Sequence, residues 1–173
     1  IRDSPEGIAV AFDLPTPTFR HKKVDTYKAG RAETPDELLQ QFDIVKETLE
    51  VLGIRSIAIS GYEADDILAT YAAKAKKENI SSIIVTGDRD SYQLVSDPFV
   101  KVLYNRRGVS DYVLYDEDGI RERTGVAPSD YVTYAALRGD KSDNLPGVPG
   151  VGEKTAAKLV NEYGTMDEIF GAA

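Results

Sequence analysis

Eight carboxylates in this sequence fall into four short clusters, each where a strand is expected to end or a helix to begin. They are Asp13, Glu63, Asp65, Asp66, Asp88, Asp90, Asp140 and Asp143. If the fold gathers these acids, their mutual repulsion creates a pocket that divalent cations would stabilise. The chain has no cysteine and one histidine, so oxygen donors favour Mg²⁺ or Mn²⁺ over zinc. Two such ions about 4 Å apart support in-line phosphoryl displacement by water.

Each cluster also has an ordinary structural explanation. Acids at 63–66 suit a helix N-terminus, Asp13 suits a strand-end cap, and the segments 88–90 and 140–143 suit turns. For any one cluster alone, both explanations stay open. Four clusters on loops expected at one edge of a sheet favour the metal site.

A glycine-rich segment follows the last acidic cluster and is suited to holding a phosphate backbone. Glycines let the chain approach a phosphate closely, and the helix expected after Gly152 presents free N–H groups. Such contacts hold the backbone and do not discriminate bases. An ordinary turn between two helices is the alternative. The candidate DNA-binding residues are Gly147, Val148, Gly150, Val151, Gly152, Lys154 and Thr155.

A basic stretch lies between Arg20 and Arg31, close to Asp13. It carries five cations against one acid. Arg20, Lys28 and Arg31 are candidates for neutralising a reacting phosphate, although a solvated surface is the ordinary explanation. Tyr27 could stack on a base or pack inside the fold.

The overall charge argues against a nucleic-acid partner unless cations are bound. The net charge is −8 and the pI is about 4.7, whereas nucleic-acid-binding domains are usually basic. Two divalent ions in the acidic pocket would contribute four positive charges there. No apolar run approaches the roughly 20 residues of a membrane span, so no membrane partner is expected.

The order of elements predicts an α/β fold with a mostly parallel sheet flanked by helices. Apolar runs predict strands at 8–12, 55–59, 82–85, 99–103 and 112–115, with a polar turn at 105–108. Helices are expected at 34–53 and 63–78, at 90–94, and from 116 onward. In the first helix, Thr34 is the expected cap, and one face is expected to be buried: Leu38, Phe42, Val45, Leu49 and Leu52. Ligands of such sheets bind at the carboxyl ends of the strands.

Long segments of the chain resemble the bacterial 5'-nuclease family, which includes flap endonucleases and the N-terminal 5'-to-3' exonuclease domain of DNA polymerase I. They are FDLPTPTFRHKKVDTYKAGRAETPDELLQQ, GYEADDILAT, VTGDRDSYQLV and LRGDKSDNLPGVPGVGEKTAAKL. The resemblance implies a PIN-like nuclease core at 1–125. It also implies a truncated helix-3-turn-helix DNA-binding region, of the helix-hairpin-helix type, at 126–173.

The resemblance also implies a function and a division of roles. The implied activity is cleavage of 5' flaps, nicked or gapped duplexes and RNA primers, by a monomer in the bacterial cytoplasm and nucleoid. Asp13, Glu63, Asp65 and Asp66 would surround a first metal, and Asp88, Asp90, Asp140 and Asp143 a second. Arg20, Lys28 and Arg31 would contact the scissile phosphate. Residues 147–152 would bind duplex with a K⁺ ion, and a polymerase domain could be fused to the chain.

One departure from the family pattern keeps an alternative open. The family has a further aspartate on an N-terminal strand, and no such segment precedes Ile8. The ligand set is then eight of nine, and the alternative is a DNA-holding module without activity. An aspartate-based phosphohydrolase of small molecules is a third hypothesis, but VTGDRDS does not match its motif cleanly.

Overall fold

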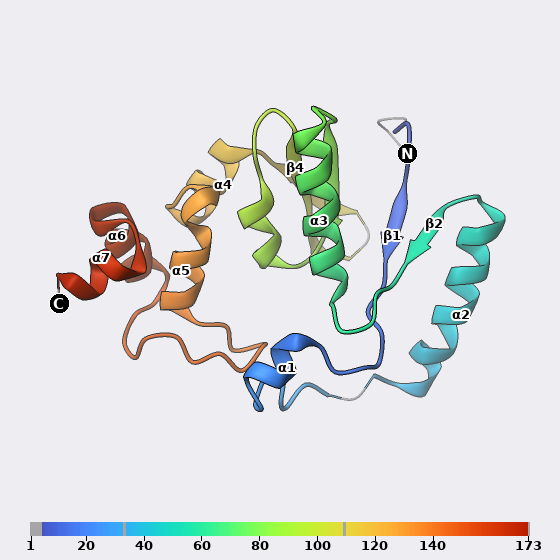
Figure 1. Cartoon of the computed structure of the whole chain (residues 1–173), viewed down its shortest axis with the longest axis horizontal. Helices are drawn as coiled ribbons and strands as arrows, with labels where there is room; N and C mark the ends of the chain where they lie inside the picture. The colour runs from blue at the N-terminus through green and yellow to red at the C-terminus, as the bar shows by residue number, and fades with distance from the viewer. Residues whose placement is uncertain (1–4, 33, 109, 173) are drawn as a thin grey trace. The chain divides into compact units, whose positions relative to one another are not determined.

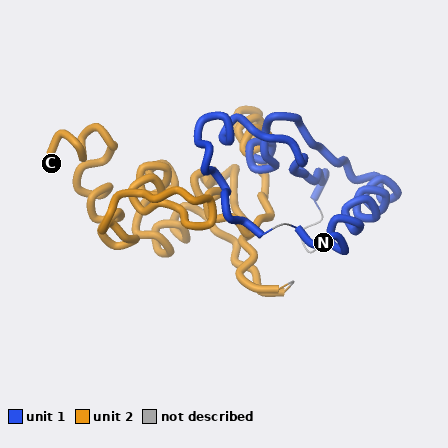
Figure 2. The backbone as a smooth tube through the Cα atoms, turned by 90° about the horizontal axis from the view of Figure 1, so that it is seen from below, with its two compact units in different colours: residues 1–68 blue, residues 69–173 orange. Residues whose placement is uncertain are grey.

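The computed structural model describes residues 5–32, 34–108 and 110–172 (Figure 1). It divides into two compact units, residues 1–68 and 69–173, with the boundary inside helix α3 (Ala64–Lys77) (Figure 2). The expectation about a segment before Ile8 falls partly on residues 1–4, which lie outside the described residues. The first unit contains a two-stranded sheet and the second a three-stranded sheet. The α/β class is therefore confirmed, with the strands divided between two sheets.

The first unit is built on one parallel strand pair. Strand β1 (Ala9–Ala11) runs parallel to β2 (Arg55–Ile57), with Ala9 opposite Arg55. Helices α1 (Phe19–Lys23) and α2 (Asp36–Val51) lie between these strands in sequence, and α3 follows β2. Because β1 and β2 are parallel, their carboxyl ends lie at the same edge, where the chain continues into Asp13 and toward Glu63.

Helix α2 confirms its predicted position but not its predicted cap. Pro35, not Thr34, is the N-cap, and no side-chain hydrogen bond caps the helix. The Thr34 prediction is wrong because Pro35 still has extended backbone (ψ 143°), which starts the helix one residue too late for that cap. At the other end Gly53 has φ 70°, and Ile54 N–H donates to Leu49 O at 2.8 Å. This is the expected glycine C-terminus.

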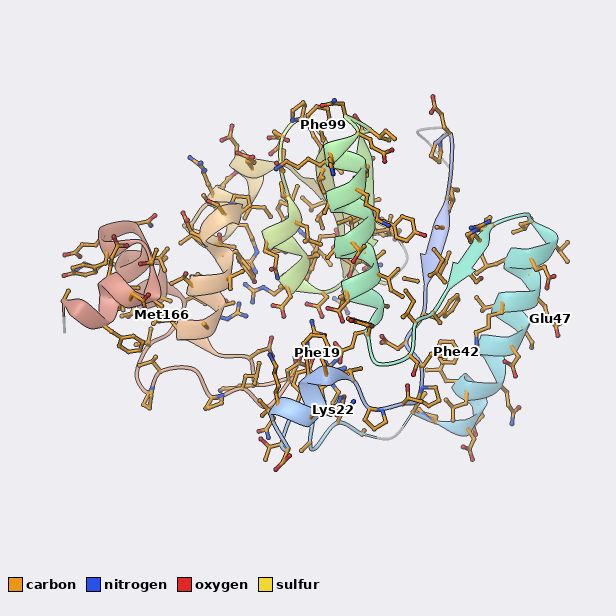
Figure 3. All side chains as sticks on the ribbon, in the orientation of Figure 1. Phe19, Lys22, Phe42, Glu47, Phe99 and Met166 are labelled. Atoms are coloured by element: carbon orange, nitrogen blue, oxygen red, sulfur yellow. The ribbon has the colours of Figure 1, made fainter. Side chains whose placement is uncertain are left out.

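The predicted burial of one α2 face is wrong. Leu38, Phe42 and Val45 are 50%, 40% and 43% exposed. Phe42 contacts the Phe12 ring edge-on at 6.4 Å, and Figure 3 shows Glu47 on the other side of the helix. The apolar face of α2 therefore points toward the end of β1, as its pattern predicts, although it is not buried. Two strands of three residues offer too little apolar surface to cover four helical turns.

The second unit begins with a mixed sheet. Strand β3 (Ser82–Thr86) pairs in parallel with β4 (Val100–Arg107), and β4 pairs antiparallel with β5 (Asp111–Tyr115). Strand β4 is longer than predicted, and the turn expected at 105–108 is largely strand because Arg107 still pairs with Asp111. The elements that follow or connect these strands are η1 (Arg89–Leu94), α4 (Glu117–Thr124), η2 (Pro128–Asp130), α5 (Tyr131–Arg138), α6 (Glu153–Tyr163) and α7 (Met166–Gly171).

Five tyrosines form the aromatic centre of the second unit, here called the tyrosine cluster: Tyr92, Tyr104, Tyr115, Tyr131 and Tyr134. Tyr92 is fully buried and contacts Tyr131 with ring centroids 5.6 Å apart. This contact packs η1, the segment that follows β3, against α5. The tyrosine cluster therefore holds the loop after β3 beside the helical part of the unit.

Over the described residues, none of the helices has the length and apolar character needed to cross a membrane.

Candidate functional site

The first acidic group consists of Asp13, Glu63, Asp65 and Asp66, all in the first unit. Asp13 follows β1, and its Oδ1 accepts a hydrogen bond from the Ala64 N–H at 2.6 Å. That contact attaches the end of the strand to the first residue of α3 and brings Asp13 beside Glu63 and Asp65 in space. Asp13 is exposed, and its second oxygen accepts no hydrogen bond from the described part of the chain.

Glu63 is the most buried acid of the first group, at 7% exposure. The Lys28 Nζ lies 3.0 Å from Glu63 Oε1, and the Tyr27 hydroxyl donates to Oε2 at 3.2 Å. A buried carboxylate is tolerated only with such partners. Lys28 has a left-handed backbone (φ 56°), a conformation that non-glycine residues seldom adopt.

Asp66 is held by a two-pronged contact with Arg20. Two guanidinium nitrogens donate to its two carboxylate oxygens, each at 2.8 Å, and the Glu63 N–H donates to Oδ2 at 2.9 Å. The hydrogen bond from Arg20 keeps the pKa of Asp66 below its usual value, against the effect of burial. The same hydrogen bond raises the pKa of Arg20.

The predicted phosphate-binding cations Arg20 and Lys28 contact the first acidic group directly. Arg20 pairs with Asp66, and Lys28 pairs with Glu63. Arg31 is exposed, and its N–H donates to Lys28 O at 3.2 Å. Of the two roles considered for Tyr27, the structure shows packing: it is 7% exposed and meets the His21 ring edge-on at 5.2 Å.

Replacing Arg20 by glutamine is expected to destabilise the chain by about 1 kcal/mol at pH 7, because both partners are partly exposed. Arg20→Lys should recover only part, since a lysine cannot make the two-pronged contact. The folded pKa of Asp66 is depressed, so this stability is present above the usual carboxyl pKa and disappears as pH falls through the folded pKa. Urea unfolding at pH 7 and pH 3 measures it.

Lys22→Gln is the matched control, because Lys22 is an exposed cation on the same helix α1 (Figure 3). It should change stability by less than about 0.5 kcal/mol. Equal stability of Arg20→Gln and the parent chain at pH 7 would contradict the role of this pair.

The second acidic group consists of Asp88, Asp90, Asp140 and Asp143, all in the second unit. Asp88 follows β3 and caps η1, because its Oδ1 accepts from the Asp90 N–H at 2.8 Å. The Asp88 N–H donates to Thr86 Oγ1 at 3.0 Å, and Ser91 Oγ donates to Asp88 O at 2.6 Å. These local bonds fix the backbone of the loop. They involve the main-chain oxygen and one carboxylate oxygen of Asp88, and the other carboxylate oxygen accepts no hydrogen bond within the described ranges.

Within the second group, Asp90 has the most strongly raised pKa. Burial raises its pKa to about 6, and the charges of Asp88, Asp140 and Asp143 add to that increase. Arg138 acts in the opposite direction. The two acidic segments, far apart in sequence, are therefore close enough in the second unit to repel each other, as the sequence predicts.

Asp140 and Asp143 lie in the loop after α5. Asp140 Oδ1 accepts from the N–H and hydroxyl of Ser142, at 2.7 and 2.6 Å, and from the Asp143 N–H at 3.3 Å. Burial would raise the pKa of Asp140, but these hydrogen bonds and the charge of Arg138 outweigh it and lower the pKa. Asp143 is 9% exposed. This loop thus has the hydrogen bonds expected of an ordinary turn, and its two acids also lie near Asp90.

The donors of the second group are of the chemical type that a hard divalent cation prefers. They are all carboxylate oxygens, they lie among repelling charges, and Asp90 keeps a raised pKa. Across 5–32, 34–108 and 110–172, no three acidic or histidine side chains converge closely enough to hold an ion as they stand. The first group is different, because Glu63 and Asp66 already have cationic partners in the protein.

The glycine-rich segment forms a hairpin between α5 and α6, as predicted. It is attached to α5, since the Val148 N–H donates to Leu137 O at 2.9 Å. Gly147 (φ 64°) crosses Gly139 (φ 76°) so closely that a Cβ on either would overlap the other's backbone. The start of the loop that carries Asp140 is therefore in direct contact with the start of the hairpin. The bridge between Asp140 and Leu145 closes the intervening turn.

The hairpin leads directly into α6. Gly152 is the N-cap of α6 and provides no side-chain hydrogen bond. Lys154 and Thr155 are exposed in the first helical turn, and Gly150 and Gly152 are exposed in the hairpin. The N-terminal N–H groups and the lysine face solvent, an arrangement that can bind an anion.

Two arginines near the second group were missed at the sequence level. Arg138 is 11% exposed as a side chain, donates from Nε to Gly139 O at 3.0 Å and lies 3.9 Å from Asp140 Oδ2. Arg89 lies between Asp88 and Asp90 and donates to Glu153 Oε1 at 3.0 Å. Their positions next to candidate ligands in the sequence were a usable signal.

The fold and the acidic groups define a PIN-like α/β domain followed by a helical region with a glycine hairpin. Family models for the 5'-3' exonuclease match the chain in two parts: the N-terminal resolvase-like domain at residues 1–125 and the C-terminal SAM fold at 126–173. The chain belongs to the 5'-3' exonuclease family.

Relatives and a solved structure agree with this membership. DNA polymerase I of Mycobacterium tuberculosis is 51% identical over 96% of this chain and 18% of that protein. The thermostable DNA polymerase I of Thermus thermophilus is 45% identical over 97% of this chain and 19% of that protein. The chain thus spans about a fifth of their length. A bacteriophage T5 flap endonuclease complex with DNA and metal ions shares the fold, with a TM-score of 0.79 and 24% identity over 97% of this chain and 64% of that chain.

Proposed function

We propose that this chain is a structure-specific 5'-nuclease that hydrolyses phosphodiester bonds at 5' flaps, nicked or gapped duplexes and RNA primers during DNA replication and repair. The observation that supports it most directly is the second acidic group. Burial, together with the charges of Asp88, Asp140 and Asp143, raises the pKa of Asp90 to about 6. The four carboxylates adjoin a hairpin suited to a phosphate backbone, through the crossing of Gly139 and Gly147.

The proposal assigns a divalent cation, Mg²⁺ or Mn²⁺, to each acidic group. Asp13, Glu63, Asp65 and Asp66 would hold one ion, and Asp88, Asp90, Asp140 and Asp143 the other. When bound, such ions supply charge stabilisation to the reacting phosphoryl group and lower the pKa of water. The metal ions in the T5 complex support this assignment. Asp88 and Asp140 would present the oxygen that their local hydrogen bonds leave available.

Arg20, Lys28 and Arg31 would hold the phosphate that is cleaved. Arg20 and Lys28 already carry their charges next to the acids of the first group. Positive charge fixed before the reaction stabilises the extra negative charge of the transition state. Lys28 would exchange Glu63 for a phosphate oxygen.

The hairpin would bind duplex DNA through backbone N–H groups, with Lys154 and Thr155 completing the contact. A K⁺ ion held by hairpin carbonyls belongs to the same proposal. Residues 1–125 would form the catalytic core and 126–173 the DNA-binding region. Because the full-length relatives are DNA polymerases, we propose a fused polymerase domain as a partner. A monomer working on the bacterial nucleoid completes the proposal.

The decisive experiment is cleavage of a labelled 5' flap with Mg²⁺. Asp65→Ala combined with Asp88→Ala is expected to reduce the cleavage rate at least about 100-fold, because one candidate ligand is lost from each group. The matched control is Glu122→Ala combined with Glu162→Ala, two exposed acids late in their helices, which should leave the rate unchanged. Full activity of the first double variant would falsify the mechanism.

The two rival functions give different results in the same assays. A DNA-holding module would bind the flap but show no calorimetric heat with divalent ions. A small-molecule phosphohydrolase would turn over a phosphate ester and show no affinity for DNA. Membership of the exonuclease family favours the nuclease over both.

A further inference from the structure

An ion pair connects the loop of Asp88 and Asp90 to the helix that follows the hairpin. Arg89 lies between Asp88 and Asp90, and its guanidinium donates to Glu153 Oε1 at 3.0 Å. Glu153 is the first residue of α6, directly after Gly152. The two ends are far apart in sequence, so the contact depends on the folded unit and not on neighbouring residues.

The arginine end of this pair is partly buried. The Arg89 Nε is buried without a hydrogen-bond partner in the described part of the chain. Its Nη2 donates to Glu153, so the guanidinium points toward the start of α6.

The two acidic loops differ in how they are attached to the hairpin. The loop of Asp140 and Asp143 is joined to it by the chain itself, at the crossing of Gly139 and Gly147. The loop of Asp88 and Asp90 follows β3 and reaches the helical region through tyrosine packing. Its hydrogen bond to α6 comes from Arg89. This hydrogen bond therefore joins the loop that carries two candidate metal ligands to the helix that carries candidate DNA-binding residues, and a side-chain substitution can remove it.

Resting on the proposed function, we propose that the Arg89–Glu153 pair sets the spacing between the hairpin and the carboxylates of the second group and thereby selects which phosphodiester is cleaved. Arg89 and Glu153 are positioning residues in this proposal. The pair is partly exposed, with side-chain exposures of 30% and 51%, so its loss should leave the chain folded.

The charges of the pair predict opposite effects of its two halves on duplex binding. Glu153 places a carboxylate beside N–H groups that would contact a phosphate, and Arg89 neutralises it. Arg89→Gln leaves that carboxylate uncompensated and should weaken duplex binding about two- to fivefold. Glu153→Gln leaves a cation without its acid and should strengthen binding by a similar factor. The double variant should bind much like the parent chain.

The experiment measures two quantities in the full chain. Fluorescence anisotropy of a labelled duplex in EDTA reports binding without any contribution from divalent ions. Product lengths from a 5' flap with Mg²⁺ report the cleavage position. The parent chain and Arg89→Lys should give one main product. Arg89→Gln, Glu153→Gln and the double variant should each spread cleavage over neighbouring positions, the double no more than the singles.

Lys101→Gln is the matched control, because Lys101 pairs with Asp116 at 3.9 Å on the sheet of the same unit. It should change neither affinity nor product length. If both single variants cut at the parent position, the positioning role is wrong while the nuclease function stands. If the parent chain neither binds duplex nor cuts the flap, the proposed function itself fails.

Discussion

Asp90→Asn is expected to abolish flap cleavage and at the same time to stabilise the chain at pH 7.5 in EDTA. The cleavage rate should fall about 100-fold or more, because a candidate ligand at the centre of the second group loses its charge. Stability should rise by about 1–2 kcal/mol, after allowing for solvent screening, since asparagine removes the cost of burying a charged carboxylate and the repulsion from three neighbouring acids. For a chain of this size that is a melting-temperature increase of about 2–6 °C.

The sign of the pH dependence follows from the raised pKa of Asp90, about 6 against a usual 3.8. The folded chain binds the proton more tightly than the unfolded chain. The stability contributed by protonated Asp90 is therefore present below pH 3.8 and is lost as pH rises through 6. The advantage of Asp90→Asn should be largest above pH 7 and disappear near pH 4.

Thermal unfolding of both proteins between pH 4 and pH 8 measures this prediction. Asp118→Asn is the control: Asp118 is an exposed acid in the first turn of α4, where the helix dipole favours it. That variant should be neutral or slightly destabilised. A lower melting temperature for Asp90→Asn at pH 7.5 would show that Asp90 is held by favourable contacts and not by repulsion.

Gly147→Ala is expected to cost about 3 kcal/mol or more of folding stability and to remove duplex binding. Gly147 has φ 64°, and an added Cβ would overlap the backbone of Arg138 and Gly139. Backbone atoms cannot rotate away as a side chain can, so the crossing must open. Since Asp140 follows Gly139 directly, the second acidic group should be disturbed as well. Urea unfolding and anisotropy with a labelled duplex measure both effects.

Gly150→Ala separates the clash from backbone strain. Gly150 also has a positive φ, 81°, but nothing lies within 4 Å of its added Cβ. It should lose only about 1–2 kcal/mol, the cost of a left-handed backbone at a non-glycine residue. Comparable losses for the two variants would mean that the crossing is not close-packed in solution.

The sequence predicts which acids lie close together better than it predicts the side chains that pair with them. Asp88 and Asp140 could be grouped from sequence because strand ends and post-helical loops constrain where a carboxylate lies. The pairing of Arg20 with Asp66 could not, since 46 residues separate them and a charge pattern does not specify distance. The burial of Tyr27 was undecidable for the same reason. A tyrosine in a basic stretch fits a surface or a core equally well.

Helix α2 shows that burial, too, is only partly predictable from sequence. Its 3.6-residue pattern predicts the helix and its Gly53 terminus correctly. The pattern also predicts a buried face, but burial requires a covering surface, and periodicity carries no information about the size of that surface. Leu52, on the predicted face, is 65% exposed for this reason. The Thr34 cap failed more locally, because the backbone of Pro35 decides where the helix starts.

The tyrosine cluster gives this chain an internal optical probe. The sequence has no tryptophan and ten tyrosines, and Tyr92 and Tyr131 meet edge-on between η1 and α5. Near-ultraviolet circular dichroism of the chain is therefore a tyrosine signal that depends on this packing. Because the same packing holds the loop of Asp88 and Asp90 against the helical region, the signal reports, without any label, on the assembly of the second acidic group.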